Sequence, residues 1–361
     1  MPDGQRIARA GEIRGTRGHD SHRAKRFGLV GSLRHPTSVE YLYNEGPRGI
    51  LGLGRLNLGD LLCSPQTYLD LDSDHRTLII GGGIQSAYVT GKKHPPEGYD
   101  KVCVWGGGLS SRPQQRLPKQ IPGIDIWTIR DKDCVPDQEN WLPCVSCLHP
   151  MLDHPALTRI RGRKLLYVNA DPVIYSPAAL LRSRQMARER GFDFCTNRAD
   201  VHDFFRKWHD CEHVVTNSYH GAYWSLLAGK SVAIFGYNYK FYSLASMFGL
   251  STRPIMFSKL DRKALIESTR AALDAAEPES LNNPEENLED FRARQMRFGQ
   301  ALCGAGVLRS LRPKPAGVAR GSIMGKKELN RLLVEYAGRA DSRITAQMRA
   351  VRRQAPGLTL R

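Results

Sequence analysis

Apolar and polar positions follow two different periods along the middle of the chain. Short, mostly apolar runs such as TLIIGGGI (77–84) and KVCVWGGGL (101–109), each running into three glycines, are typical of strands that are buried on both faces of a sheet. From about residue 160, such runs alternate with segments of helical periodicity. The pattern predicts strands at 164–172 (ending in a turn), 192–197, 213–217 and 231–236, and helices at 177–191, 200–211, 221–229, 260–276 and 285–301. Strands that alternate with helices indicate an α/β fold built on mainly parallel sheets.

The length of the chain suggests two domains. Its 361 residues, 41% of them hydrophobic, are enough for two cores. We expect an N-terminal lobe at 37–155 and a C-terminal lobe with its closing helices at 156–300. A Gly- and Arg-rich segment at 1–36 is expected to be unstructured, and a basic tail at 301–361 contains one predicted helix near 326–353. The sequence has no apolar run of about 18 residues, so no membrane span is predicted, and its first residues lack the apolar segment of a secretory signal.

Positive charge is concentrated at the two ends of the chain. The formal net charge is +17, of which residues 1–36 carry +5 and residues 301–361 carry +10, so residues 37–300 carry only +2. Basic tails of this kind attract nucleic acid, anionic lipid or another polyanion, or simply remain solvated. No nucleic-acid-binding motif accompanies the charge, which disfavours DNA and RNA as partners. The eight cysteines, in a chain without an export signal, predict cytosolic thiols.

Three consecutive glycines follow each of two predicted strands, at 81–83 and at 106–108. In open α/β sheets a ligand binds beyond the carboxyl ends of the strands, and glycine lets it approach the backbone closely. For either triplet alone a tight turn is the favoured interpretation, but two such loops in one domain favour a ligand crevice. Neither triplet has the spacing of a dinucleotide fingerprint or of a P-loop.

The segment HVVTNSYHGAYWSLLAGKSVAIFGYNYKFYS (213–243) contains the most informative pattern. Its first strand ends at Thr216, and Asn217 or Ser218 is a natural N-cap for the helix that follows. His220 and Gly221 then fall in the first helical turn, where free N–H groups favour an anion. A histidine there either transfers a proton near neutral pH or only caps and packs the helix start.

Five elements, in this order, resemble those of the polysaccharide pyruvyl transferase family. They are NLGD (57–60), the two glycine-rich strand ends, Ile129-Arg130-Asp131, and VVTNSYHGAYWSLLAGKSVAIFGYNYKFY (214–242). The resemblance implies two Rossmann-like lobes of the glycosyltransferase-B type. It also implies transfer of a pyruvyl group from phosphoenolpyruvate to a sugar as a ketal, with no cofactor and no obligatory metal.

The same resemblance implies roles for individual residues. His220 is expected to act as acid or base, and Asp60 to take a hydroxyl proton or to bind the acceptor. Many members carry an arginine where this chain has Ser218, so we assign the donor's negative charges to Arg130 and Lys240. The predicted donor-binding residues are Arg130, Asn217, Ser218, Gly221 and Lys240, and the predicted acceptor-side residues are Asn57, Gly82, Gly83, Gly107, Gly108 and His149.

The family typically acts on lipid-linked or polymeric glycans. We therefore expect a cytoplasmic protein that contacts the inner membrane face through its basic tail. Two other functions stay open: a nucleotide-sugar glycosyltransferase of similar fold, and a non-catalytic protein that binds polyanions or membrane surfaces.

Two further clusters suggest metals. Cys134, Cys144, Cys147 and His149 fall within 16 residues, which fits either a Cys₃His zinc site or a loop near the substrate. The lack of a second Cys-x-x-Cys favours the loop. The acidic run DLDSD (70–74) is similar to the metal-binding acids of nucleotide-sugar transferases, but its position favours a polar turn.

Overall fold

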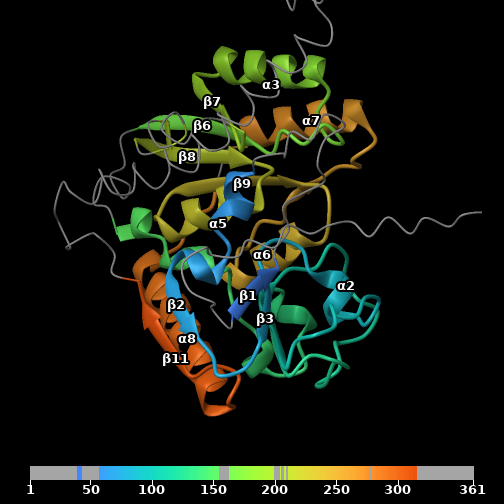
Figure 1. Cartoon of the computed structure of the whole chain (residues 1–361). Helices are drawn as coiled ribbons and strands as arrows, with labels where there is room; N and C mark the ends of the chain where they lie inside the picture. Colours follow the sequence, from blue (N-terminus) through green and yellow to red (C-terminus); the bar gives the residue numbers. More distant parts are fainter. Residues whose placement is uncertain are drawn as a thin grey trace, which may run out of the picture.

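The computed structural model describes residues 39–42, 57–153, 162–198, 204, 207–208, 210–275 and 278–314. Within these residues the chain forms two parallel β-sheets accompanied by helices (Figure 1). The predicted α/β class with parallel sheets is confirmed. The segment at 1–36 and the predicted helix near 326–353 lie outside the described residues, and so does most of the predicted helix at 200–211.

The first sheet has four strands in the order β1-β3-β4-β5, and all neighbours are parallel. Its strands are β1 (Val39–Leu42), β3 (Thr77–Gly81), β4 (Lys101–Gly107) and β5 (Ile126–Ile129). β3 is buried along its whole length, as its continuous apolar run predicts. Two single-turn helices belong to this part of the chain, α1 (Leu58–Leu61) and α2 (Ser86–Val89).

The second sheet has five parallel strands in the order β10-β9-β8-β6-β7. They are β6 (Arg163–Val168), β7 (Phe192–Thr196), β8 (Cys211–Thr216), β9 (Ser231–Gly236) and β10 (Ile255–Met256). The chain first adds β7 on one side of β6 and then continues through β8 on the other side. The strand order therefore reverses between β6 and β8, and ligands of open α/β sheets bind at such a switch point, beyond the carboxyl ends of the strands.

Helices cover both faces of the second sheet. α3 (Pro177–Glu189) and α7 (Arg262–Leu273) lie together on one face, and α5 (Tyr219–Leu227) lies on the other with α6 (Lys240–Phe248) beside it (Figure 1). Every residue of α5 is buried, because the helix is apolar on nearly all sides and lies between the sheet and α8.

The long helix α8 (Pro284–Gly304) follows the second sheet in sequence and also packs against the first. The indole Nε1 of Trp105 in β4 donates a 2.7 Å hydrogen bond to Oε1 of Gln295. The Trp105 and Phe298 rings meet edge to face, with their centroids 5.0 Å apart. α8 therefore connects the two halves of the molecule.

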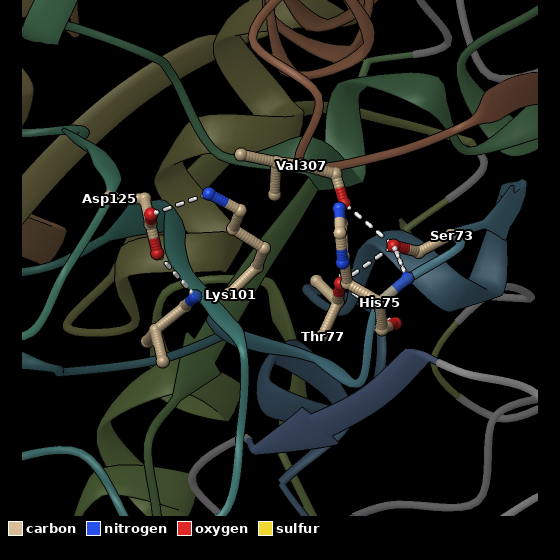
Figure 2. A network of polar contacts seen from close by, with 7 residues as sticks. Ser73, His75, Thr77, Lys101, Asp125 and Val307 are labelled. Atoms are coloured by element: carbon tan, nitrogen blue, oxygen red, sulfur yellow. Dashed lines mark hydrogen bonds and ion pairs between the residues drawn. The ribbon is translucent and has the colours of Figure 1, made fainter.

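The chain beyond α8 remains folded up to residue 314. β11 (Ser310–Pro313) pairs antiparallel with β2 (Leu69–Asp72). The carbonyl of Val307 accepts hydrogen bonds from the hydroxyls of Ser73, at 2.9 Å, and Thr77, at 3.2 Å. Figure 2 shows the bond from Ser73. The first residues of the predicted tail, 301–314, are thus part of the folded structure.

The acidic run at 70–74 takes part in this junction. Arg309 pairs with Asp72 and Asp74, and the Lys314 ammonium lies 3.8 Å from Asp70. The first three residues of the run belong to β2, so the predicted turn is confined to its end. The acidic run therefore neutralises Arg309 and Lys314, which flank β11.

Candidate functional site

Three segments that are far apart in sequence meet at the start of α5. The Nε2 atom of His220 lies 3.6 Å from the sulfur of Cys144. Cys63 joins this pair, and the two sulfurs and a His220 ring nitrogen all lie within 4.8 Å of one another. Gly59 lies against the imidazole so closely that a Cβ atom there would come within 2.0 Å of Nδ1. Residues from both halves of the molecule thus surround His220.

The short helix α1 places Asp60 beside His220. Its N-cap Asn57 accepts a 3.1 Å hydrogen bond from the Gly59 amide and donates a 2.9 Å bond to the Asp60 carboxylate. The Leu58 amide donates to the carbonyl of Asn197, which follows β7, so α1 is attached to the second sheet. Burial raises the pKa of Asp60, and the positive charges of His220, Lys240 and Arg130 oppose this rise.

The start of α5 is built for close packing. Ser218 caps the helix by accepting a hydrogen bond from the Gly221 amide, at 3.3 Å. A Cβ atom on Gly221 would lie 2.4 Å from the Tyr167 ring of β6, so glycine lets the helix approach the sheet. One turn further, Tyr223 donates to the Cys144 carbonyl at 2.9 Å, and Trp224 donates to the Ser146 hydroxyl at 3.0 Å. These bonds hold Cys144 over His220.

Arg130 follows β5 and is almost completely buried, with 3% of its surface exposed. Its guanidinium lies over the Tyr219 ring, 3.9 Å from the centroid. A Cβ atom on Gly108 would lie 2.5 Å from Nη2, so this glycine makes room for the arginine. Burial lowers the pKa of Arg130. The opposite effect of nearby Tyr219, Asp131, Cys144 and Cys63 is larger, so the pKa lies above its ordinary value and the guanidinium stays charged.

Lys240, the first residue of α6, is a second buried cation. Its Nζ donates a 2.9 Å hydrogen bond to the Tyr237 hydroxyl. Among the residues that the structure describes, no carboxylate forms an ion pair with Lys240 or Arg130, and the buried Nε of Arg130 has no hydrogen-bond partner. Two buried cations without a carboxylate partner are suited to hold an anion.

Three asparagines mark the carboxyl ends of β6, β7 and β8. The Asn217 side chain accepts a 2.7 Å hydrogen bond from the Asn169 amide, and the Asn197 side chain accepts a 2.9 Å bond from the Ala170 amide. The Nδ2 group of Asn217 is buried and has no hydrogen-bond partner among the residues that the structure describes. Asn169 and Asn197 were not predicted as site residues. The repeated pattern of a strand followed by asparagine, at VNA, CTN and VTN, is the signal that points to them.

The remaining predicted residues lie around this group. Gly82 and Gly83 adopt left-handed φ angles of 74° and 67°, which require glycine in the turn after β3. A Cβ atom on Gly107 would lie 3.0 Å from the Gln85 side chain. The space beside Gly107 and Gly108 is therefore occupied by the side chains of Gln85 and Arg130, not by open backbone.

The predicted cysteine and histidine cluster is dispersed in the structure. The Nδ1 atom of His149 accepts a hydrogen bond from the Met151 amide, and burial, with the nearby Arg292, lowers the pKa of His149 to about 3. Cys134 donates to the Tyr239 hydroxyl. Among the described residues, the Cys/His group with metal-ligand spacing consists of Cys63, Cys144 and His220. Of these, Cys63 was missed because only the tertiary fold brings it to the other two.

Comparison with known proteins shows a distant likeness of fold to solved structures. No protein-family profile matches the chain, and no curated protein matches it significantly in sequence. Among solved structures, the chain is similar to a spinosyn rhamnosyltransferase, SpnG, complexed with thymidine diphosphate. The match covers 63% of this chain and 63% of that chain, at 13% identity and a TM-score of 0.27.

None of the helices in the described part of the chain combines the length and the hydropathy needed to cross a bilayer.

Proposed function

We propose that the protein is a sugar-modifying transferase that moves a pyruvyl group from phosphoenolpyruvate to two hydroxyls of a sugar. The observation that carries the proposal is the pair of buried cations, Arg130 and Lys240, which act electrostatically on Asp60 beside His220 but form no direct ion pair with a carboxylate among the described residues. Phosphoenolpyruvate bears a phosphate and a carboxylate, so one small donor suits both cations.

The asparagines at the strand ends complete the donor site in this proposal. The unpartnered Nδ2 group of Asn217 lies at the switch point of the second sheet, next to the N-terminus of α5. A neutral N–H donor and a helix N-terminus both favour an anion. Their position beside Arg130 and Lys240 supports a single anionic donor.

Asp60 and His220 supply the proton chemistry. The raised pKa of Asp60 suits a general acid, which protonates the methylene carbon of the donor and makes the adjacent carbon cation-like. The first sugar hydroxyl adds to that carbon and gives its proton to Asp60 or His220. Phosphate then leaves, and the second hydroxyl adds and closes the ketal while its proton passes to the phosphate. One proton thus ends in the new methyl group and one on phosphate.

Glycosyl transfer from a nucleotide sugar is the second candidate. The fold likeness reported above is to a glycosyltransferase and not to a pyruvyl transferase. The same buried cations suit the diphosphate of a sugar nucleotide. The two candidates share a sugar acceptor and differ in the donor, so donor binding separates them.

Calorimetric titration with phosphoenolpyruvate and with uridine, guanosine and thymidine diphosphate sugars tests the proposal. We expect phosphoenolpyruvate to bind, and Arg130→Ala to weaken it by about 1.5–3 kcal/mol, the value of a charge-assisted hydrogen bond. Arg190→Ala is the matched control, because Arg190 pairs with Asp274 on the far face of the second sheet and should leave donor affinity unchanged. Binding of a sugar nucleotide alone would favour the second candidate, and binding of neither donor would contradict both.

A further inference from the structure

We infer that Cys63, Cys144 and His220 form a mononuclear site for a thiophilic divalent cation, with Zn²⁺ as the ion that fits best. This site differs from the predicted Cys134/Cys144/Cys147/His149 cluster, because two of its three ligands come from distant parts of the sequence. The inference does not rest on the proposed transfer and is tested without any donor or acceptor.

The spacing of the three ligand atoms fits a tetrahedral ion. With Zn–S at about 2.3 Å and Zn–N at about 2.0–2.1 Å, tetrahedral angles place a sulfur and a nitrogen about 3.6 Å apart. The Cys144 sulfur and the His220 Nε2 atom are 3.6 Å apart. The same geometry places two sulfurs about 3.8 Å apart, within the 4.8 Å that contains all three atoms.

The ligand types and their charges favour zinc. Thiolate and imidazole are ligands of zinc, whereas magnesium and calcium prefer oxygen. Two thiolates and a neutral imidazole balance one divalent cation, so the bound group has no net charge. That balance matters here because all three residues are buried and an isolated charge at this depth is costly.

The surroundings already stabilise one thiolate. Burial raises the pKa of Cys144, but hydrogen bonds from Cys63 and His220, together with the charges of His220 and Arg130, outweigh burial, so this pKa ends well below its ordinary value. The Cys63 sulfur donates a 3.4 Å hydrogen bond to the carbonyl of Asp60. Because an ion is bound by thiolates and by a neutral imidazole, zinc binding releases protons and depends on pH.

The sulfur atoms are also oriented by their neighbours. The Gly83 amide donates a hydrogen bond to the Cys63 sulfur at 3.2 Å, and the Ser146 hydroxyl lies 3.2 Å from the Cys144 sulfur. Partners of this kind fix the ligands of metal sites and tune the bound ion. The proposed site then has three protein ligands and one open position. This is the arrangement of catalytic rather than structural zinc sites. With the ion on Nε2, His220 no longer accepts a proton there, and proton transfer falls to Asp60.

Metal titration of the purified full-length chain tests the inference. After removal of bound metal with a chelator, the protein is titrated with ZnCl₂ in competition with a chromogenic chelator. A parallel titration with CoCl₂ reports thiolate ligation through its charge-transfer absorption. We expect one ion per chain and a tetrahedral cobalt spectrum. Cys63→Ser, Cys144→Ser and His220→Asn should each weaken zinc binding by more than about 100-fold, since changes to outer-shell partners alone cost 10–100-fold.

Cys147→Ala is the matched control. It removes a buried thiol that belongs to the sequence motif but not to the proposed site, and it should leave zinc affinity unchanged. Differential alkylation with mass spectrometry adds a test that needs no variant, in which zinc should protect Cys63 and Cys144 selectively. A chain that binds no zinc, an alkylation pattern that zinc does not change, or a loss on Cys147→Ala equal to that on Cys144→Ser would each overturn the inference.

Discussion

The contact between Gly59 and His220 gives a sharp test of how the site is assembled. In Gly59→Ala, the new Cβ atom would lie 2.0 Å from Nδ1 of His220, whereas ordinary contact begins at 3.4 Å. About 1.4 Å must therefore be recovered by moving the imidazole or α1. The imidazole cannot yield freely, because His220 is buried and its ring packs against Trp224 and Tyr219.

Both function and stability should respond to this change. A displacement of about 1 Å at a reacting group costs about 100-fold in rate, so we expect turnover to fall by about that factor. Zinc affinity should fall as well, because Nε2 moves with the ring. Overpacking costs about 1–3 kcal/mol, and the better helix propensity of alanine returns up to about 1 kcal/mol. The net loss in the free energy of unfolding is then about 0–3 kcal/mol.

Turnover, zinc titration and urea denaturation measure these effects. Gly304→Ala is the matched control, since a Cβ atom at this end of α8 meets nothing within 4 Å in the described part of the chain. It should keep wild-type function and gain a few tenths of a kcal/mol up to about 1 kcal/mol in stability. If Gly59→Ala retained both turnover and zinc affinity at wild-type levels, α1 would not lie against His220 and the site described here would be refuted.

Two further predictions follow from the same structure. The raised pKa of Asp60 means that the native state holds this proton more tightly than the unfolded chain, so stability falls as pH rises from the ordinary value of 3.8 through the native pKa. Asp60→Asn should abolish transfer because it removes the proposed acid. In urea titrations the variant should be more stable than wild type at pH 8, and this gain in stability should vanish at acidic pH. An equal gain at all pH values would disprove the burial effect. Truncation after Lys314 should preserve the fold and remove a segment of net charge +7, together with any salt-sensitive binding to anionic vesicles. Truncation after Cys303 should lower the unfolding temperature because it deletes β11 and the Val307 carbonyl; equal melting of the two truncations would contradict this reasoning.

Local periodicity was sufficient to predict most of the second sheet. The strand at 192–197 and the helix at 177–191 appear as β7 (Phe192–Thr196) and α3 (Pro177–Glu189), since both are short elements with clear turn signals. The end of the folded region was harder to predict. Basic residues near 310 suggest a tail, yet β11 is held by β2, a partner that lies far away in the sequence.

The candidate site was predictable only in part, for a similar reason. Asp60 and His220 each stand in a recognisable local motif, and the structure places both at the start of α5. Cys63 has no such motif. It comes close to Cys144 because Tyr223 and Trp224 fix the chain at 144–146, a tertiary contact that no local pattern encodes.

The return of α8 and β11 to the first half of the molecule has a consequence for biosynthesis. Ser73 and its acceptor, the Val307 carbonyl, are separated by 234 residues. At synthesis rates of about 5–20 residues per second, the ribosome needs about 12–47 s to make the intervening chain. During that time the edge of β2 lacks its partner β11 (Figure 1). Trp105 of β4 lacks its hydrogen-bond partner Gln295 of α8. The N-terminal half therefore cannot finish folding before the C-terminal segments have been synthesised. Nascent chains that stall before residue 314 should depend on chaperones to remain soluble.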